Sequence, residues 1–401
     1  MQSQQPHFDV VIVGGGLIGA SQALCLAKRC PNLKIAVIEA FAASDKAQPS
    51  FDDRSIAIAH HSANYLKRLG LFQPYASYVS AIETVQVSDK GHFGKTHISA
   101  QEYQVEALGY VVEVKPFGLA LHKQLAGENI TLFCPNKVTA ISQQQHANQL
   151  TLDDHSTFSA ALIIVADGAQ SAGRRLLNVE FTQQAYQQSA IIANIEVAGG
   201  HQQQAFERFT EHGPMALLPM SDHRYSLVWC AAPHEIESLI AADDTAFLSQ
   251  LQQAFGYRAG RFCKVGMRAQ YPLIKGQASQ FISHRAVIIG NAAHAVHPIA
   301  GQGFNLGVRD IELLVEIIAQ ARATGQDIGD YAVLKQYQAQ RKRDIGTVLC
   351  LTDSLVKLFS NSSRAFALGR SIGLSCLNHS STLKKPLAKQ LMGHTRQGFL
   401  S

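Results

Sequence analysis

The hydrophobic positions of the first forty residues predict a strand, a helix and a second strand. Residues 8–13 form a nearly continuous apolar run, an Ala- and Leu-rich segment follows up to Lys28, and residues 35–38 are again apolar. A continuous apolar run that ends in glycines is typical of a parallel strand buried on both faces. This order predicts an α/β domain of the Rossmann-like type at the start of the chain.

The turn between the first strand and the helix carries a glycine motif. Gly14, Gly16 and Gly19 fit the pattern G-x-G-x-x-G, in which the glycines allow a tight turn, close approach of a pyrophosphate and close packing of helix on strand. Glu39 ends the second strand, where a carboxylate accepts hydrogen bonds from a ribose. The motif predicts a dinucleotide site, and the alternative is a glycine-rich turn in another α/β fold.

Beyond the first forty residues, the hydrophobic pattern predicts further strands and helices. Residues 82–98 alternate apolar and polar positions around Lys90-Gly91, which predicts a hairpin, and residues 161–166 form a second buried strand. The block 186–275 contains short strand-like segments, which we interpret as an antiparallel sheet. Residues 286–289 return to the first lobe, and a long helix is expected from about Asn305 to 323. We therefore expect a first lobe (1–80, 101–185 and 276–330), a second lobe (81–100 and 186–275) and a C-terminal helical segment (331–401).

Composition places the chain among globular proteins of a reducing compartment. Hydrophobic residues make up 46% of the 401 residues, but no run of about 18 apolar residues occurs, so no transmembrane helix is expected. The N-terminus lacks the pattern of a signal peptide. The seven cysteines include no C-x-x-C pair, which argues against a structural zinc site and a redox disulfide. We expect a cytoplasmic protein with no metal and no nucleic-acid partner.

Charge is concentrated at the C-terminal end. The net charge is +5, yet residues 354–401 contain no Asp or Glu and seven basic residues: Lys357, Arg364, Arg370, Lys384, Lys385, Lys389 and Arg396. Apolar residues recur between them at helical spacing. This segment predicts docking on an anionic membrane, at the inner membrane, or on partner helices. The alternative is a solvated basic face.

Three separated motifs occur in a fixed order: G-x-G-x-x-G at 14–19, Asp-Gly-x-x-Ser-x-x-Arg at 167–174, and Gly-Asn-Ala-Ala-His followed by Pro, Gly-Gln-Gly and Asn at 290–305. Together they resemble the group A flavoprotein monooxygenases, which have a p-hydroxybenzoate-hydroxylase-like fold. The resemblance covers essentially the whole chain. The segments 51–54, 212–220, 226–229 and 297–305 are most similar to the ubiquinone-biosynthesis hydroxylases, in particular those acting on 2-polyprenyl-6-methoxyphenol.

The resemblance implies FAD as the cofactor and NAD(P)H as the electron donor. It implies cofactor contacts by Gly14, Gly16, Gly19, Glu39, Arg54, Asp167, Gly168, Gly290, Asn291, Pro298, Gly301, Gly303 and Asn305. The turn Gly301-Gln302-Gly303 would direct a helix N-terminus at the flavin. Position 291 departs from the commoner Asp of the family, but Asn still hydrogen-bonds a hydroxyl group. The alternative for Asp167 and Arg174 is a structural salt bridge.

The resemblance further implies a reaction and its partners. A flavin C4a-hydroperoxide, formed with O2, would transfer an OH group to the ring of a polyprenyl phenol, with residues 215–220 as the ceiling of the pocket. The enzyme would work within a ubiquinone-biosynthesis assembly. The alternatives are a FAD-binding scaffold without activity and a hydroxylase for another ring position. The sequence assigns no acid–base residue, and His294 and His297 lack the further ligands that a metal site requires.

Overall fold

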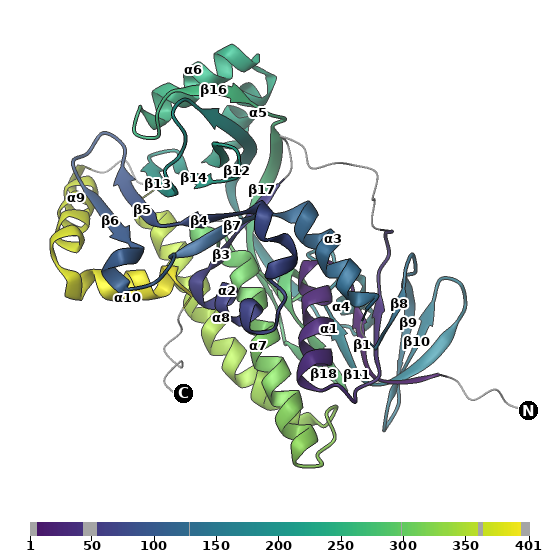
Figure 1. The fold of residues 1–401 in the computed structure, drawn as a ribbon. Helices are drawn as coiled ribbons and strands as arrows, with labels where there is room; N and C mark the ends of the chain where they lie inside the picture. Colours follow the sequence, from purple (N-terminus) through teal and green to yellow (C-terminus); the bar gives the residue numbers. More distant parts are fainter. Residues whose placement is uncertain (1–5, 43–53, 128, 298, 360–363, 394–401) are drawn as a thin grey trace, which may run out of the picture.

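The computed structural model describes residues 6–42, 54–127, 129–297, 299–359 and 364–393. Of the residues singled out above, Pro298 and residues 51–53 lie outside these ranges. Figure 1 shows two sheets side by side, with the C-terminal helices packed along both.

The first sheet has the parallel order expected of a Rossmann-like domain. Its strands run β18-β19-β11-β1-β2-β8, and neighbours from β19 to β8 are parallel. The bounds are Ile282–Ser283 for β18, Ala286–Ile288 for β19, Thr157–Val165 for β11, His7–Val13 for β1, Ile35–Ile38 for β2 and Ile130–Phe133 for β8. An antiparallel ribbon of β9 (Val138–Gln143) and β10 (Asn148–Leu152) extends from β11. The predicted βαβ unit and the strand before Asp167 are both confirmed.

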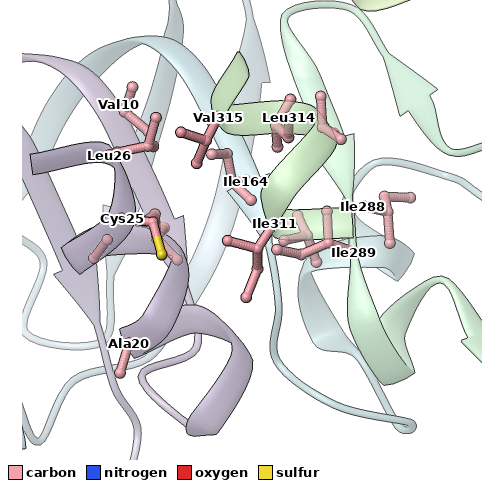
Figure 2. Close-up of a cluster of buried hydrophobic side chains, with 14 of the residues drawn as sticks. Val10, Ala20, Cys25, Leu26, Ile164, Ile288, Ile289, Ile311, Leu314 and Val315 are labelled. Atoms are coloured by element: carbon pink, nitrogen blue, oxygen red, sulfur yellow. The ribbon is translucent and has the colours of Figure 1, made fainter. Parts of the chain in front are cut away.

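Helices cover the first sheet and close its core. α1 (Leu17–Arg29) packs between α3 (Val114–Leu125) and α7 (Gln302–Ala323). Figure 2 shows Val10, Ile164 and Ile288 from the strands facing side chains of α1 and α7, and all of these are buried. A small sheet of β3 (Ser55–Ala59), β7 (Gly109–Glu113) and β4 (Val79–Ile82), with α2 (His60–Arg68), adjoins this core. The apolar runs read from the sequence are therefore the buried strands.

Within the described ranges, no strand of the second sheet is hydrogen-bonded to a strand of the first, and the second sheet joins segments that are distant in sequence. Its order is β20-β17-β12-β15-β14-β13-β5-β6, with β16 beside β12. The bounds are His294–Ala295, Ala269–Ala278, Phe181–Val197, Arg224–Ala231, Gly213–Pro219, Gln204–Thr210, Thr84–Asp89 and Lys95–Ser99, and β16 spans Phe262–Val265. The predicted hairpin is β5–β6. Its attachment to β13 is parallel, so the sheet is antiparallel except at that pair.

Two helices within the second sheet's sequence block were not predicted. α5 (Pro233–Ala241) and α6 (Asp244–Phe255) cover the outer face of this sheet, at the top of Figure 1. Signals for both were present, because Pro233 occupies the first turn of α5 and the Asp243 side chain caps α6 by accepting from the Ala246 N–H. Reading the whole block as strands was therefore wrong for residues 233–255.

The C-terminal segment is helical, as predicted, but it is not a freely exposed basic tail. It forms α8 (Tyr331–Phe359), α9 (Arg364–His379) and α10 (Ser381–Leu391). α9 packs on β6 and β5, and Ala388 and Met392 are buried with Ile98 and Leu108. Lys384 is buried and pairs with Glu102 at 3.2 Å. The prediction that Lys384 contributes to a docking surface is therefore wrong, because an acid of another element neutralises it.

No helix in the described ranges is both long enough and apolar enough to cross a membrane.

A substitution at Ala388 tests whether α10 is held by its apolar face. Ala388 is fully buried, so Ala388→Asp places a carboxylate among apolar side chains at a cost of roughly 3 kcal/mol. We expect α10 to detach while the two sheets stay folded, seen as rapid trypsin cleavage after Lys384; the bond after Lys385 precedes Pro386 and resists trypsin. Thr382→Asp, at an exposed position of the same helix, serves as the control and should keep the wild-type rate. Equal protection of Ala388→Asp and wild type would contradict this packing.

Candidate functional site

Three loops converge at the carboxyl ends of adjacent parallel strands. The glycine loop follows β1, Asp167 follows β11, and η3 (Gly290–Ala292) follows β19, and these strands are neighbours in the sheet. A Cβ on Gly14 would lie 2.7 Å from the Ala166 carbonyl oxygen and from the Asp167 Cα. A crevice outside the carboxyl ends of the strands is where open α/β sheets bind ligands. The three sequence motifs therefore meet at one place.

The glycines of the first loop have different roles. Gly14 adopts φ +100°, which favours glycine, and a Cβ on Gly19 would lie 1.8 Å from the Gly14 carbonyl oxygen. Gly16 differs, because its φ of −66° suits any residue and a Cβ there would meet no atom of the described residues within 4 Å. No described side chain caps the N-terminus of α1, which begins after Gly16. The fold thus needs Gly14 and Gly19, whereas it leaves space beside Gly16.

Glu39 lies beside the glycine loop. Its Oε2 accepts from the Gly15 N–H at 2.6 Å, and its Oε1 accepts from the Phe41 N–H at 2.9 Å. The carboxylate is thus fixed at the end of β2, half-buried and within reach of a group bound on the loop.

Asp167 and Arg174 do not pair with each other directly. Asp167 Oδ2 accepts from the Gly173 N–H at 2.8 Å, and Asp167 Oδ1 is buried with no hydrogen-bond partner among the described residues. Arg174 donates to the Ala292 carbonyl at 2.7 Å, and its guanidinium lies 4.4 Å from the centre of the Phe181 ring. The alternative of a simple salt bridge is therefore wrong. Arg174 instead ties this motif to η3.

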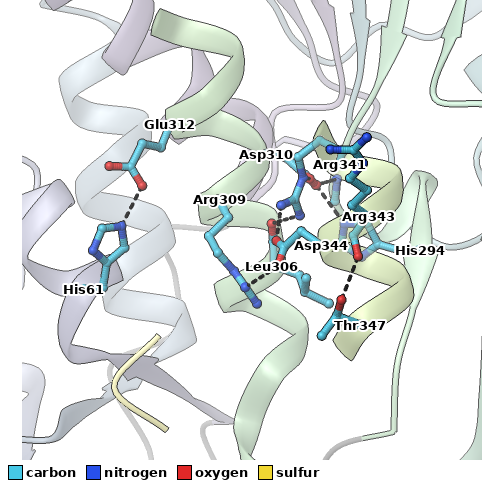
Figure 3. Close-up of polar contacts among 11 residues, drawn as sticks. His61, His294, Leu306, Arg309, Asp310, Glu312, Arg341, Arg343, Asp344 and Thr347 are labelled. Carbon is cyan, nitrogen blue, oxygen red and sulfur yellow. Dashed lines mark hydrogen bonds and ion pairs between the residues drawn. The ribbon is translucent and has the colours of Figure 1, made fainter. Parts of the chain in front are cut away.

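A buried carboxylate fixes the third loop. Asp310 of α7 is fully buried, and its Oδ2 accepts from the Gly290 N–H at 2.8 Å and contacts His294 Nε2 at 2.7 Å. Figure 3 shows Arg341 of α8 reaching the other oxygen of the same carboxylate. Burial acts to raise the pKa of Asp310, but Arg341 and His294 hold it at about 2. Asp310 is therefore ionised at neutral pH and joins η3, α7 and α8.

The network extends along α8. Asp344 accepts from Arg341 and, at 2.9 Å, from Arg309, while Arg341 also donates to the Leu306 carbonyl at 3.1 Å. Burial lowers the pKa of Arg309, and the nearby acid Asp344 counters that effect. Each buried charge in this group faces one of opposite sign, which is the condition for burying charges without a large penalty.

The turn before α7 is held by Asn305. Its Oδ1 accepts from the Ala59 N–H at 2.8 Å, and its Nδ2 donates to the carbonyls of Ala57 and Gly301. Gly301 adopts φ +60° as the N-cap, and a Cβ there would lie 2.8 Å from the Ala57 Cβ. The helix begins at Gln302, three residues before the predicted start. The Asn305 amide thus shapes this turn, and the backbone occupies its hydrogen-bonding groups.

A cavity of about 360 Å³ lies between the lobes. Arg54, Lys115 and Val114 line one side, and residues of β12 and β17 with Met267 line the other. Arg54 donates to the Tyr271 hydroxyl at 3.3 Å. Arg54, expected in a loop beside the flavin, therefore lies at the junction of the lobes.

The remaining predicted residues are distributed as follows. Asn291 is exposed beside buried Gly290, and Gly168 adopts φ +84°. A Cβ on Gly303 would lie 4.0 Å from the Val296 side chain, with no closer contact to another described element. Sequence reasoning missed Asp310 and Arg341. The available signal was an acid among the apolar positions of a buried helix, which is rare without a partner.

No group of potential metal ligands occurs in the described part of the chain. His294 contacts Asp310, whereas the His297 ring packs against Tyr186 with their centres 4.9 Å apart.

Comparison with known proteins identifies the family to which the chain belongs. Residues 7–352 match the family model described as FAD binding domain. The chain belongs to the FAD-dependent flavoprotein monooxygenases. It is 33% identical to ubiquinone hydroxylase UbiL of Rhodospirillum rubrum, over 97% of this chain and 90% of that protein, and 30% identical to 3-demethoxyubiquinol 3-hydroxylase of Escherichia coli, over 96% and 98%. The crystal structure of p-nitrophenol 4-monooxygenase PnpA from Pseudomonas putida superposes with a TM-score of 0.77 at 17% identity, over 97% and 99% of the two chains.

The monooxygenase site fits FAD on independent structural grounds. Among the described residues, Gly16 has open space beside it and buried Asp167 Oδ1 has no hydrogen-bond partner. The N-terminus of α1 offers N–H groups of positive potential. Phosphates bind at helix N-termini for this reason, and a buried acceptor needs a donor, which a bound ligand can supply. FAD is therefore the cofactor of this aromatic-ring monooxygenase.

Replacing Asp310 tests the network that fixes η3. Asp310→Asn removes one of the two acids that pair with buried Arg341 and leaves Asp344 as its remaining counter-charge, so we expect the free energy of unfolding at pH 7 to fall by about 3 kcal/mol. The ionised form stabilises the fold, because its pKa of about 2 lies below the ordinary 3.8. The difference from wild type should be complete above pH 4 and shrink as pH falls toward 2. Urea unfolding at several pH values measures it.

Glu316→Gln on the same helix provides the matched control. Glu316 and Arg29 form an exposed pair, and such pairs contribute less than about 1 kcal/mol. Similar losses for the two variants, or a loss in Asp310→Asn that is independent of pH, would contradict the role of the buried carboxylate.

Proposed function

We propose that this monooxygenase hydroxylates the aromatic ring of a polyprenylated phenol in ubiquinone biosynthesis, with 2-polyprenyl-6-methoxyphenol as its substrate. The observation that carries the proposal is that the loops after β11 and β19 lie next to the second sheet, on the apolar face opposite α5 and α6. We call this the inner face. Both curated relatives are named for hydroxylation in this pathway, and both are aligned over nearly the whole chain. The name 3-demethoxyubiquinol 3-hydroxylase supports a second candidate, hydroxylation at another position of the same ring.

The cofactor is held, in this proposal, by the three loops already described. Gly14, Gly16, Gly19 and Glu39 take the ADP half, while Asp167, Gly168, Gly290 and Asn291 take the central part. Gly301, Gln302 and Gly303 place the N-terminus of α7 at the flavin, where its dipole stabilises negative charge. In this proposal Asn305 contributes indirectly, because its hydrogen bonds to Ala57 and Gly301 hold the turn that contacts the flavin. Bound FAD, reduced by NAD(P)H, supplies the oxygen-activating chemistry.

The chain's own contribution is to exclude water and to orient the ring. Ala190, Cys230 and Leu273 form a buried apolar cluster on the inner face of the second sheet. Met215 and Leu217 instead pack on the outer face with α5 and α6. The ceiling proposed for residues 215–220 must therefore be formed by alternate residues such as Leu218, because successive side chains of a strand point to opposite faces.

In this proposal Arg54 binds the electron donor NAD(P)H, and the basic C-terminal segment contacts a membrane or partner proteins. Arg54 lies at the cavity between the lobes, where a guanidinium suits the phosphates of NAD(P)H. Peripheral contact with an anionic membrane, or with other proteins of the pathway, is proposed for the part of 354–401 that remains exposed. Leu383 and Lys385 are examples of exposed residues there. Lys384 is excluded from this surface by its pair with Glu102.

Labelled oxygen tests the proposed reaction. The purified enzyme with FAD, NADH or NADPH and 2-polyprenyl-6-methoxyphenol should place one atom from ¹⁸O2 on the ring. Mass spectrometry of the product, with fragmentation, gives both the label and its position. Label from water, or NAD(P)H oxidation without a hydroxylated product, would contradict the monooxygenase reaction on this substrate. In a parallel assay with 3-demethoxyubiquinol as the substrate, a labelled hydroxyl group on its ring would support the second candidate instead.

Two glycine variants separate cofactor binding from folding. Gly16→Val puts a side chain into space that the fold leaves open, so we expect wild-type thermal stability with at least about a ten-fold loss of FAD affinity. Gly19→Ala collides with the Gly14 backbone and should lose both stability and FAD. Flavin absorbance after gel filtration and thermal unfolding provide the measurements. A Gly16→Val protein that keeps its FAD would remove Gly16 from the cofactor site.

A further inference from the structure

Two buried polar groups lie together where the second sheet meets the flavin-lobe turn. The ring of His297 is fully buried and lies edge-on to Tyr186, with an interplanar angle of 90°. His297 Nε2 and the Tyr186 hydroxyl are both buried, and neither has a hydrogen-bond partner within the described ranges. Buried polar groups in native proteins are nearly always satisfied, so a pair left open at this place indicates a ligand.

The hydrogen bonding of His297 fixes what it can offer. Its Nδ1 accepts from the Ile299 N–H at 3.3 Å, two residues before the turn at Gly301. Burial lowers the pKa of His297 to about 4, so the ring is neutral at pH 7. A neutral imidazole with Nδ1 as acceptor carries its one proton on Nε2. His297 therefore presents a single N–H donor, which requires an acceptor such as oxygen.

The backbone around Tyr186 is arranged to direct its side chain. The pairing of β12 with β17 shifts register between Ala185 and Ser189, and Gln187 within this bulge adopts φ +56°. Bulges of this kind re-aim side chains and are frequent beside active sites. The Tyr186 ring then packs in an apolar cluster with Phe209, Ile299 and Leu374.

The surroundings suit an uncharged ligand. The cluster combines residues of β13, α9 and the turn before α7, so that both lobes and the C-terminal helices contribute to it. Lys275 lies 6.0 Å from the centre of the Tyr186 ring, and Asp353 pairs with it at 3.2 Å. An aromatic ring with a hydroxyl or methoxyl group matches the chemistry of these groups, because apolar side chains suit the ring and the two polar groups suit its oxygen.

We propose that His297 Nε2–H and the Tyr186 hydroxyl bind a ring oxygen of the substrate and thereby determine which ring carbon is hydroxylated. This inference rests on the proposed function. The two groups are binding residues for the substrate, and they anchor one side of the ring while the apolar cluster holds its faces.

Equilibrium binding to the FAD-loaded enzyme without reductant tests this assignment. The probes are ortho-prenylphenol and prenylbenzene, which differ only in the ring oxygen, and the signal is the change in flavin absorbance. Tyr186→Phe and His297→Leu should each weaken binding of ortho-prenylphenol about ten-fold, the value of one hydrogen bond to a buried group. Prenylbenzene should bind all forms alike. His297→Gln, which keeps an N–H donor, should recover most of the affinity.

Tyr225→Phe is the matched control, since Tyr225 is a buried tyrosine on the outer face of the same sheet. It should leave both affinities unchanged. Equal weakening of both probes in Tyr186→Phe, or an unchanged affinity for ortho-prenylphenol, would overturn the assignment. If His297→Leu does not retain FAD, Tyr186→Phe decides the question by the same two criteria.

Product analysis separates this inference from the function on which it rests. Wild type should give one hydroxylated isomer of ortho-prenylphenol, and the variants a mixture, because the ring can turn once its anchor is lost. Wild type that binds no phenol, or yields no hydroxylated product, would contradict the proposed function and the inference together. If wild type, Tyr186→Phe and His297→Leu all yield the same single isomer, only the inference is overturned.

Discussion

The fold around the cofactor depends on one buried ion pair. Asp310 has no access to solvent and is ionised, so it requires the Arg341 guanidinium on α8 and the N–H of Gly290 together. An unpaired charge at this depth would cost several kcal/mol, which makes other placements of the loop after β19 unfavourable. The carboxylate therefore fixes η3 relative to two helices, and Arg174 extends this constraint to the loop after β11 through the Ala292 carbonyl.

The same constraint links the loops of the first lobe to the second sheet. The segment that leaves η3 passes through His294, held by Asp310, to His297 and Ile299, which contact residues of the second sheet and α9. Asn305 then returns the chain to β3 by hydrogen bonds to Ala57 and Ala59. A single stretch of about 15 residues thus carries groups that we propose for both the cofactor and the ring, and its two ends are anchored by the buried side chains of Asp310 and Asn305.

Local patterns were sufficient to predict the first lobe from the sequence. The apolar runs of β1, β2 and β11 and the glycines between 14 and 19 act over a few residues, so their meaning is visible in the sequence. Helices α5 and α6 were missed because the whole block 186–275 was interpreted as an antiparallel sheet from its strand-like segments, although a proline and an aspartate marked the starts of the helices. A capping residue is a local signal, and it should have outweighed the assumption of a continuous sheet.

Long-range partners could not be predicted in this way. Lys384 resembles any exposed lysine of a basic helix, and only Glu102, far away in sequence, makes it a buried residue. Asp310 and Arg341 likewise lie on different helices, and Tyr186 meets His297 across the lobes. The motifs pointed to three loops that meet at one edge of the sheet, whereas the charges that fix those loops depend on tertiary contacts.

The central claim is that the buried network builds the cofactor seat before FAD binds. Hydrogen exchange of the Gly290 amide in the FAD-free protein tests it most directly, because this N–H donates to the buried Asp310 carboxylate. The account predicts slow exchange without FAD and little further slowing when FAD is added. Exchange as fast as that of exposed loops in the FAD-free protein, with protection only after FAD is added, would contradict it.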